Sequence, residues 1–320
     1  MRRGFSAILV SSFCFGFIGA FNIWGRSYGF SPMQATTNRF FTATVVFWLI
    51  IMLRRRDDCR LSGSDMLLMA LQGLGLAFTS ICYALALQSL QASMVAVLFY
   101  IHPIFTMLGA TLVYREPLTR NKVLALMVAL GGCILSADPG SLFIGTASPR
   151  GVMWILLGGL SYSLFNLFAQ RTSTISSPLV SVTWVTTFCT LALFIIEAPR
   201  HLLDGSMNLQ TWGFSFLFGL ICSVIPYFLY LLGVSQLGAL LASIAGATEA
   251  MFGLLVSIVV LGDRLVWLQA LGVPFIFGSV LILQGDLLRY ALRLRRGDDL
   301  LYDSPTSNVE GEQQTNLDSP

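Results

Sequence analysis

Apolar residues along this chain fall into long runs separated by short polar stretches. A helix that crosses a bilayer needs about 20 mostly apolar residues (range roughly 17–25), and ten segments qualify. The first has no small-residue cleavage site after it, so we expect it to be retained as a helix. The pattern predicts an all-α, polytopic membrane protein with ten transmembrane helices, at residues 5–24, 31–53, 66–87, 92–114, 121–137, 151–170, 178–197, 212–232, 239–261 and 265–285.

The second half of the chain repeats the pattern of the first at an offset of 147 residues. Glu116 and Asp263 are this far apart, and each lies between two apolar runs; the same offset places His102 opposite Glu249. Because five helices is an odd number, two copies of a five-helix unit must insert in opposite orientations. We therefore expect two inverted five-helix repeats, at 1–140 and 150–286, joined by a Pro-, Gly- and Ser-rich linker at 137–149.

Composition agrees with a membrane protein, and the placement of basic residues predicts its orientation. The 320 residues are 55% hydrophobic and 11% charged, which is more apolar surface than a soluble domain of this size can bury. If the N-terminus is cytoplasmic, the loops on that side carry fourteen Lys and Arg residues against four on the other. By the positive-inside rule we expect a multi-pass protein of the cell inner membrane with both termini in the cytoplasm.

Motifs for cofactors and catalysis are not found in the sequence. The six cysteines have no close spacing, which argues against a disulfide framework or a zinc cluster, so we expect no metal or other cofactor. The sequence has no Walker-type loop, HExxH or GxSxG motif. Beyond Gly297 acidic residues replace apolar ones, and we expect residues 287–320 to form a disordered cytoplasmic tail.

Two stretches at the repeat spacing resemble a known family. One runs from His102 through Glu116 to Leu118; the other runs from Glu249 to Leu265 and is followed by the helix Gly272–Leu283. Over about the first 286 residues the chain resembles the drug/metabolite transporter superfamily, in particular its ten-helix EamA-like branch. It departs from the family pattern at three places: Asp263 replaces a Glu, Tyr114-Arg115 replaces a Gly before Glu116, and Ala250 replaces a frequent Pro.

The resemblance implies a secondary transporter of small polar metabolites, such as amino acids or their derivatives, that works by alternating access and commonly exports them. Inverted repeats suit this mechanism, and they place the substrate near the bilayer midplane between the two halves. The partners expected are therefore a small-molecule substrate and the lipid bilayer, not nucleic acid, and a homodimer is left open. The alternative is a non-transporting scaffold or an intramembrane enzyme that acts with a cytoplasmic partner through the acidic tail.

Three ionisable residues lie inside predicted membrane helices, where a charge is costly and is usually functional: Arg39, His102 and Glu249. Glu249 is our candidate for proton or cation coupling; the alternative is a protonated Glu bonded to a neighbouring helix. Arg39 could hold a substrate carboxylate with its planar guanidinium. Snorkelling to the outer headgroups, or a salt bridge to Glu249, explains it equally well. His102 could relay protons, although a neutral histidine hydrogen-bonded within the bundle is the plainer explanation.

The remaining candidates are polar or aromatic. Pro103 should bend its helix and free the carbonyl of Phe99, so among the aromatic residues we choose Tyr100 for substrate binding. Gln34 with Asn38, and Asn166 with Gln170, form i, i+4 pairs that either join helices or line the cavity. The amides assigned to substrate binding are Asn22, Asn38, Asn166 and Gln170. Glu116 and Asp263 are expected to cap the helices that follow them.

Overall fold

A computed structural model of the chain describes residues 2–54, 61–90, 92–116, 118–136, 148–205, 207–262 and 267–296. Within these ranges every regular element is a helix, as the sequence predicted. The expectations for most of the linker (137–147), for Asp263 and for the acidic stretch 297–320 concern residues outside the described ones.

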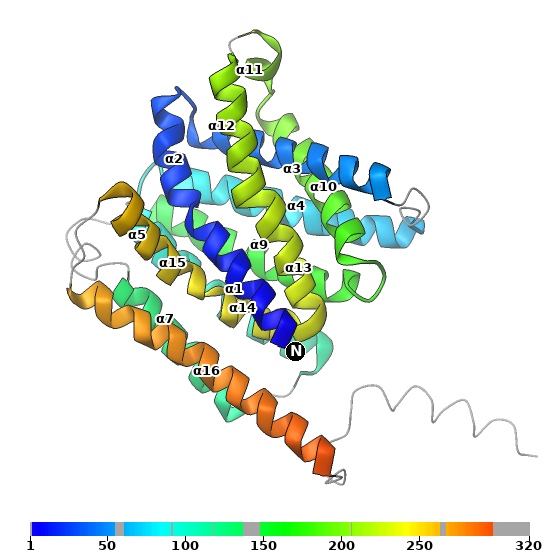
Figure 1. The fold of residues 1–320 in the computed structure, drawn as a ribbon, viewed down its shortest axis with the longest axis vertical. Helices are drawn as coiled ribbons and strands as arrows, with labels where there is room; N and C mark the ends of the chain where they lie inside the picture. Colours follow the sequence, from blue (N-terminus) through cyan, green and yellow to red (C-terminus); the bar gives the residue numbers. More distant parts are fainter. Residues whose placement is uncertain are drawn as a thin grey trace, which may run out of the picture.

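The first repeat forms the blue-to-green helices of Figure 1, and each of its predicted segments is helical. Ser62 starts α4 by accepting a hydrogen bond from the Asp65 backbone N–H. Thr119 does the same for Lys122 at the start of α7, so the expectation that Glu116 caps this helix is wrong. The helices are α1 (Arg2–Gly16), α2 (Ile18–Ser27), α3 (Pro32–Arg54), α4 (Gly63–Ala86), α5 (Ala92–Phe99), α6 (His102–Tyr114) and α7 (Arg120–Ser136).

The second repeat is helical in the same order. Within the described ranges, seven helical stretches are long and apolar enough to cross a membrane. The shorter helices α5–α6, α7 and the start of α16 account for the other three predicted segments. The elements are α9 (Pro149–Thr172), α10 (Pro178–Ile196), α11 (Arg200–Leu203), α12 (Leu209–Gly219), the π-helix η2 (Leu220–Val224), α13 (Ile225–Leu237), α14 (Ala239–Gly246), α15 (Thr248–Val256), the π-helix η3 (Ser257–Leu261) and α16 (Trp267–Arg296). The structure differs at the end of α16: residues 287–296, which the sequence assigned to the tail, continue the helix.

Helix pairing follows the symmetry expected of two inverted repeats. The first helix of one repeat packs against the third of the other in both directions, α1 against α13 and α9 against α4. The first helix also packs against the fourth of the other repeat, α1 against α14–α15 and α9 against α5–α6. Like helices meet at α3 with α10 and at α7 with α16, the latter along one edge of the bundle (Figure 1). The two halves therefore share one interface rather than forming separate bundles.

Close backbone contact holds the α7–α16 pair together. A Cβ added at Gly132 would lie 2.8 Å from the Ile276 nitrogen and 2.9 Å from the Gly272 carbonyl oxygen. No side chain fits at such distances, so glycine is required where these two helices cross.

The fourth helix of each repeat is broken near the middle of the bundle. The sequence predicted a bend at Pro103, but α5 ends at Phe99 and Pro103 lies in the first turn of a separate helix, α6. Proline suits that position because its missing N–H would have no helical partner there. The second repeat has the same break at Ala247, between α14 and α15.

These breaks correct the predicted register of the repeat. The i to i−3 bonds that close the two turns are donated by the Ile101 and Ala247 backbone N–H groups, 146 residues apart rather than 147. Structurally, Glu249 therefore corresponds to Pro103, not to His102. The left-handed residues that end the two broken helices, Arg115 and Gly262, are again 147 apart. The extra residue is taken up in η3, because a π-helical turn holds one more residue than an α-helical turn.

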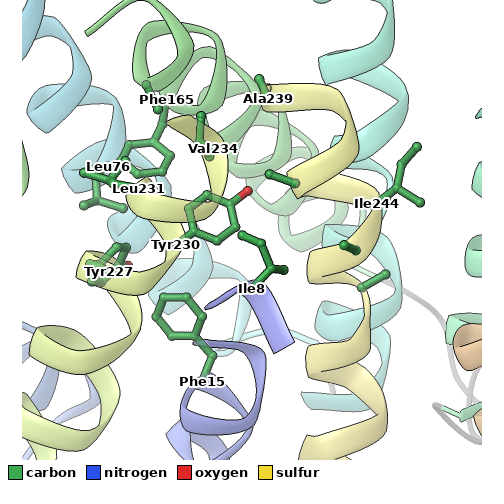
Figure 2. Close-up of a cluster of buried hydrophobic side chains, with 14 of the residues drawn as sticks. Ile8, Phe15, Leu76, Phe165, Tyr227, Tyr230, Leu231, Val234, Ala239 and Ile244 are labelled. Carbon is green, nitrogen blue, oxygen red and sulfur yellow. The ribbon is translucent and has the colours of Figure 1, made fainter. Parts of the chain in front are cut away.

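Apolar side chains from α1, α9, α13 and α14 pack together in the centre of the bundle, as Figure 2 shows for Ile8, Phe165, Tyr230 and Ile244. The outer face also carries large apolar side chains: Leu53 is 85% exposed and Ile195 84% exposed. A surface of that kind suits lipid rather than water.

Candidate functional site

A cavity of about 740 Å³ lies between the two repeats and reaches the middle of the bundle. Its walls run from Arg26 and Pro32 at one end of the helices down to Arg39, Tyr100 and Glu249. We call the end with Arg26 and Pro32 the open end, and the opposite end, where α1 begins and α6 stops, the closed end. A cavity of this size suits a small organic molecule.

Arg39 lines the cavity, and a carbonyl freed by a proline holds its guanidinium. Pro226 has no N–H, so the carbonyl of Cys222, four residues earlier, lacks its helical donor. Arg39 Nη1 donates to that oxygen at 3.1 Å and to Ser223 Oγ at 3.4 Å, and its guanidinium carbon lies 4.5 Å from the centre of the Phe40 ring. Arg39 is only 7% exposed, which excludes snorkelling, and its Nε has no hydrogen-bond partner.

Glu249 also lines the cavity, in the first turn of α15 just after the helix break. Among the described residues the ion pair within 4.0 Å joins Lys122 and Glu116, so Glu249 and Arg39 share the cavity without forming the salt bridge considered as an alternative. No described residue donates a hydrogen bond to the Glu249 carboxyl group. The N-terminus of α15 stabilises a negative charge there, whereas removal from water opposes it.

On the closed-end side of Glu249 lies a second, much smaller space of about 10 Å³, which we call the chamber. His102, Tyr162, Tyr230, Ser243 and Glu249 line it. His102 is 4% exposed, and its ring packs edge-on against that of Tyr162 with 4.7 Å between centroids. Its Nδ1 has no hydrogen-bond partner, and no described residue bonds to Nε2, so the hydrogen bond within the bundle that the plainer explanation requires is not found among the described residues.

At the closed end, polar side chains join the two repeats. Gln170 Nε2 donates to Glu116 Oε1 at 2.9 Å, while Gln170 Oε1 accepts from the Ala239 backbone N–H at 2.8 Å. Tyr114 Oη donates to the Leu167 carbonyl at 2.7 Å, and Lys122 Nζ lies 3.6 Å from Glu116 Oε2. We call this set the clasp: Tyr114, Glu116, Lys122, Gln170 and the Ala239 N–H.

The other predicted amides lie outside the centre of the cavity. Asn22 lines the cavity wall near the open end, but it donates a hydrogen bond to the Ile18 carbonyl of its own helix at 2.9 Å. Asn38 is buried between helices, donates to Ser215 Oγ at 3.3 Å and lies 2.8 Å from His201 Nε2. Because an amide oxygen can only accept, the His201 ring nitrogen donates to the Asn38 carbonyl oxygen; burial lowers the pKa of His201, which lies outside the spanning helices. Asn38 therefore joins helices.

Asn166 also joins helices, since its Oδ1 accepts from Tyr230 Oη at 2.8 Å, and its Nδ2 has no partner. Apart from Asn38, which lies between helices near the open end, the predicted site residues divide into two groups. Asn22, Arg39, Tyr100 and Glu249 line the large cavity, whereas His102, Asn166 and Gln170 lie between that cavity and the closed end.

The sequence analysis missed part of the cavity wall. Thr79 and Tyr83, on one face of α4, line it together with Tyr227 of α13 and Gln269 of α16. The i, i+4 spacing of Thr79 and Tyr83 was a usable signal. For Tyr227 the proximity of Pro226 could have served, because a proline within an apolar helix marks a freed carbonyl.

Comparison with known proteins agrees with this architecture. The model of the EamA-like transporter family matches the chain twice, over residues 2–137 and 149–284. A protein of Archaeoglobus fulgidus named as an uncharacterized transporter is 25% identical over 283 residues, covering 88% of this chain and 96% of its own length. One of Clostridium kluyveri with the same name is 21% identical over 257 residues, covering 78% of this chain and 80% of its own.

A solved crystal structure superposes with a TM-score of 0.72 at 18% identity, covering 91% of this chain and 97% of the other. That similarity shows the fold. The two matches to the family model, one in each inverted repeat, show more: the chain is a multi-pass membrane protein, a transporter in the general sense, and it belongs to the EamA-like transporter family.

Proposed function

We propose that this protein is a secondary transporter that exports a small polar metabolite by alternating access, coupled to protons through Glu249. The observation that carries the proposal is the cavity between the repeats. It reaches the open end, stops in mid-bundle at Glu249 and is separated from the other end by the clasp. Exchanging the conformations of two inverted repeats would close this cavity and open its counterpart.

The side chains of the cavity favour a zwitterionic substrate, which carries one carboxylate and one ammonium group, such as an amino acid or a derivative. Arg39 supplies a guanidinium with an unpaired Nε for a carboxylate, and Glu249 supplies a carboxylate for an ammonium group. Aromatic rings from Tyr83, Tyr100 and Tyr162 line the remaining wall. Because a proton and a substrate ammonium would compete for Glu249, proton entry would drive substrate exit.

The distribution of basic residues supports an orientation for the cavity. The closed end carries Arg115, Arg120, Lys122 and Arg171, whereas Arg26, Arg150 and Arg200 lie at the open end. By the positive-inside rule the closed end faces the cytoplasm, and the state described is open to the outside. We propose that this membrane is the cell inner membrane.

The test is flux in proteoliposomes. We expect an imposed pH gradient to drive accumulation of radiolabelled L-amino acids supplied as a mixture, and Glu249→Gln to abolish that driven component, because Gln cannot exchange a proton. Glu197→Gln is the matched control, since Glu197 follows α10 and lies outside the cavity. Driven flux that survives Glu249→Gln removes Glu249 from the mechanism.

Arg39→Lys tests the carboxylate site. Lysine keeps the charge but loses the fork that binds a carboxylate with two parallel bonds. We expect the affinity for zwitterionic amino acids to fall about tenfold or more, as for the loss of a charge-assisted hydrogen bond, with a smaller change for their amides, which carry no carboxylate. Arg26→Lys at the cavity mouth is the control. Equal losses for both substrate types would assign Arg39 to structure alone.

A further inference from the structure

The chamber behind Glu249 has no role in substrate binding, yet its walls are polar. It lies within the closed half of the molecule, where α6, α9, α13 and α15 converge, and Figure 2 shows the Tyr230 ring with its hydroxyl among the surrounding apolar side chains. Its volume of about 10 Å³ is close to that needed by one water molecule, roughly 10–15 Å³. Apolar packing would have filled such a gap at less cost than polar groups.

Most hydroxyl groups around the chamber already have partners, including that of Tyr162, which interacts with the Tyr230 hydroxyl, and this leaves two groups that need one, His102 and Glu249. Tyr230 donates to Asn166, Ser243 to the Leu240 carbonyl and Ser12 to the Gly246 carbonyl. His102 makes no side-chain hydrogen bond to the described part of the chain, and its Nδ1 is fully buried. Glu249, which also lines the large cavity, has no such bond either. A buried imidazole without a partner is unfavourable unless water supplies one.

We propose that the chamber holds one water that links the His102 imidazole to the Glu249 carboxyl group, which makes His102 a second proton-binding residue of this transporter. This inference rests on the proposed proton coupling through Glu249. Glu249 is placed to receive a proton from the large cavity, because it lines both spaces. His102 lies on the side that faces the clasp, so it lies on the route a proton must take to leave through the closed end.

The transfer needs no other reactant. Protonated Glu249 gives its proton to the water, and the water gives another of its protons to a free imidazole nitrogen of His102. The products are the Glu249 carboxylate, a neutral water and the His102 imidazolium. The imidazolium holds the proton until the repeats exchange conformations. Once the proton has left on the closed-end side, the Glu249 carboxylate binds the substrate there.

Few titratable or charged groups near His102 would mask proton transfer between it and Glu249. Tyr162 lines the chamber from α9, Tyr230 from α13 and Glu249 from α15, whereas α1 contributes Ser12 and Phe15 and α14 contributes Ser243 and Gly246, none of which titrates. The Tyr100 ring lies 6.5 Å away at the turn before α6, and Arg39 faces the other side of Glu249 across the large cavity. Within the part of the chain that the structure describes, Glu249 is therefore the one carboxylate that lines the chamber.

Direct observation of His102 tests the link without any transport. The sequence has two histidines, so His201→Gln leaves His102 as the only source of imidazole ¹⁵N signals in labelled, membrane-reconstituted protein. We expect the pH midpoint of the His102 signal to move by about one unit or more when Glu249 is also changed to Gln, the size expected for a charge within about 4–6 Å. An unchanged midpoint overturns the inference.

Transport then tests the consequence. His102→Gln can hold the water but not a proton, so we expect pH-driven accumulation to fall at least about tenfold, the loss expected for a group that transfers protons. Exchange of amino acids without a pH gradient should remain. Thr106→Val, one turn along α6, is the control, because Thr106 bonds only to the His102 backbone carbonyl.

The two proposals fail differently. If wild-type protein shows no pH-driven flux, the proposed coupling is wrong, and the ¹⁵N measurement still decides whether His102 and Glu249 are linked. If Glu249→Gln abolishes driven flux while His102→Gln retains it, the coupling stands and the second proton site is wrong.

Discussion

The open and closed ends of the bundle are built from equivalent helices but differ in polarity. At the closed end, α6 stops at Tyr114, followed by left-handed Arg115, and Tyr114 bonds to the Leu167 carbonyl of α9. At the open end, η3 stops at Leu261, followed by left-handed Gly262, and Leu261 lines the cavity. Tyrosine can hydrogen-bond to the opposite repeat and leucine cannot. The backbone is repeated, but this part of the clasp is not.

This difference in hydrogen bonding explains how two similar halves can favour one conformation. If the two repeats were identical, the state closed at one end and the state closed at the other would have equal free energy. Here Gln170 and Tyr114 each add one hydrogen bond between the repeats at one end, at 2.9 and 2.7 Å. Each such bond contributes about 0.5–1.5 kcal/mol net, so together they bias the equilibrium toward the state described.

Gln170→Leu should reduce the difference in stability between the two ends more than any other change. It removes two hydrogen bonds and leaves the Ala239 N–H without its partner, which we expect to weaken the closed end by about 2–4 kcal/mol. The measurement is labelling of Ser243→Cys in the chamber by a water-soluble maleimide, in a background whose six native cysteines are alanine. Labelling should rise by at least about tenfold.

Gln34→Leu is the matched control for that experiment. Gln34 also accepts from a backbone N–H, that of Ser31 at 3.0 Å, but at the exposed start of α3 at the open end. If it raises labelling as much as Gln170→Leu, the clasp does not determine which end is closed.

Exchanging the residues at the equivalent helix ends tests whether Tyr114 and Leu261 set the conformational equilibrium. Tyr114→Phe loses one hydrogen bond of about 1 kcal/mol and should favour opening of the closed end roughly fivefold. Leu261→Tyr offers a hydroxyl at the other end and should shift the equilibrium in the same direction, because it stabilises closure of the open end. Distances between spin labels on the two sides report both changes. Opposite shifts would show that the symmetry argument fails.

Lys122→Gln should have the smallest effect. Lys122 and Glu116 are 3.6 Å apart, and their side chains are 16% and 22% exposed. An ion pair of this kind contributes less than about 1 kcal/mol and weakens with salt. The same labelling assay at low and high ionic strength should show a change of at most a few-fold in the wild type, and none in the variant.

The sequence was a good guide to the elements and to which residues deserved attention. Long apolar runs predicted the helices because bilayer thickness and backbone hydrogen bonding leave few alternatives. The same reasoning singled out Arg39 and Glu249, because a charged side chain inside a membrane helix is costly and is usually kept for function. Both residues line the cavity. It could not tell that Asn166 and Gln170 bond to Tyr230 and Glu116, because those partners are 64 and 54 residues away along the chain.

By itself, then, the sequence determined the membrane class, the helical segments, the duplicated unit and its family resemblance, all of which depend on local hydropathy and spacing. Only the tertiary structure decided where the fourth helices break, that π-helical turns shift the register of the repeat by one residue, and that one end is closed. Those features depend on contacts between helices far apart in sequence. A pattern along one chain carries no direct record of such contacts.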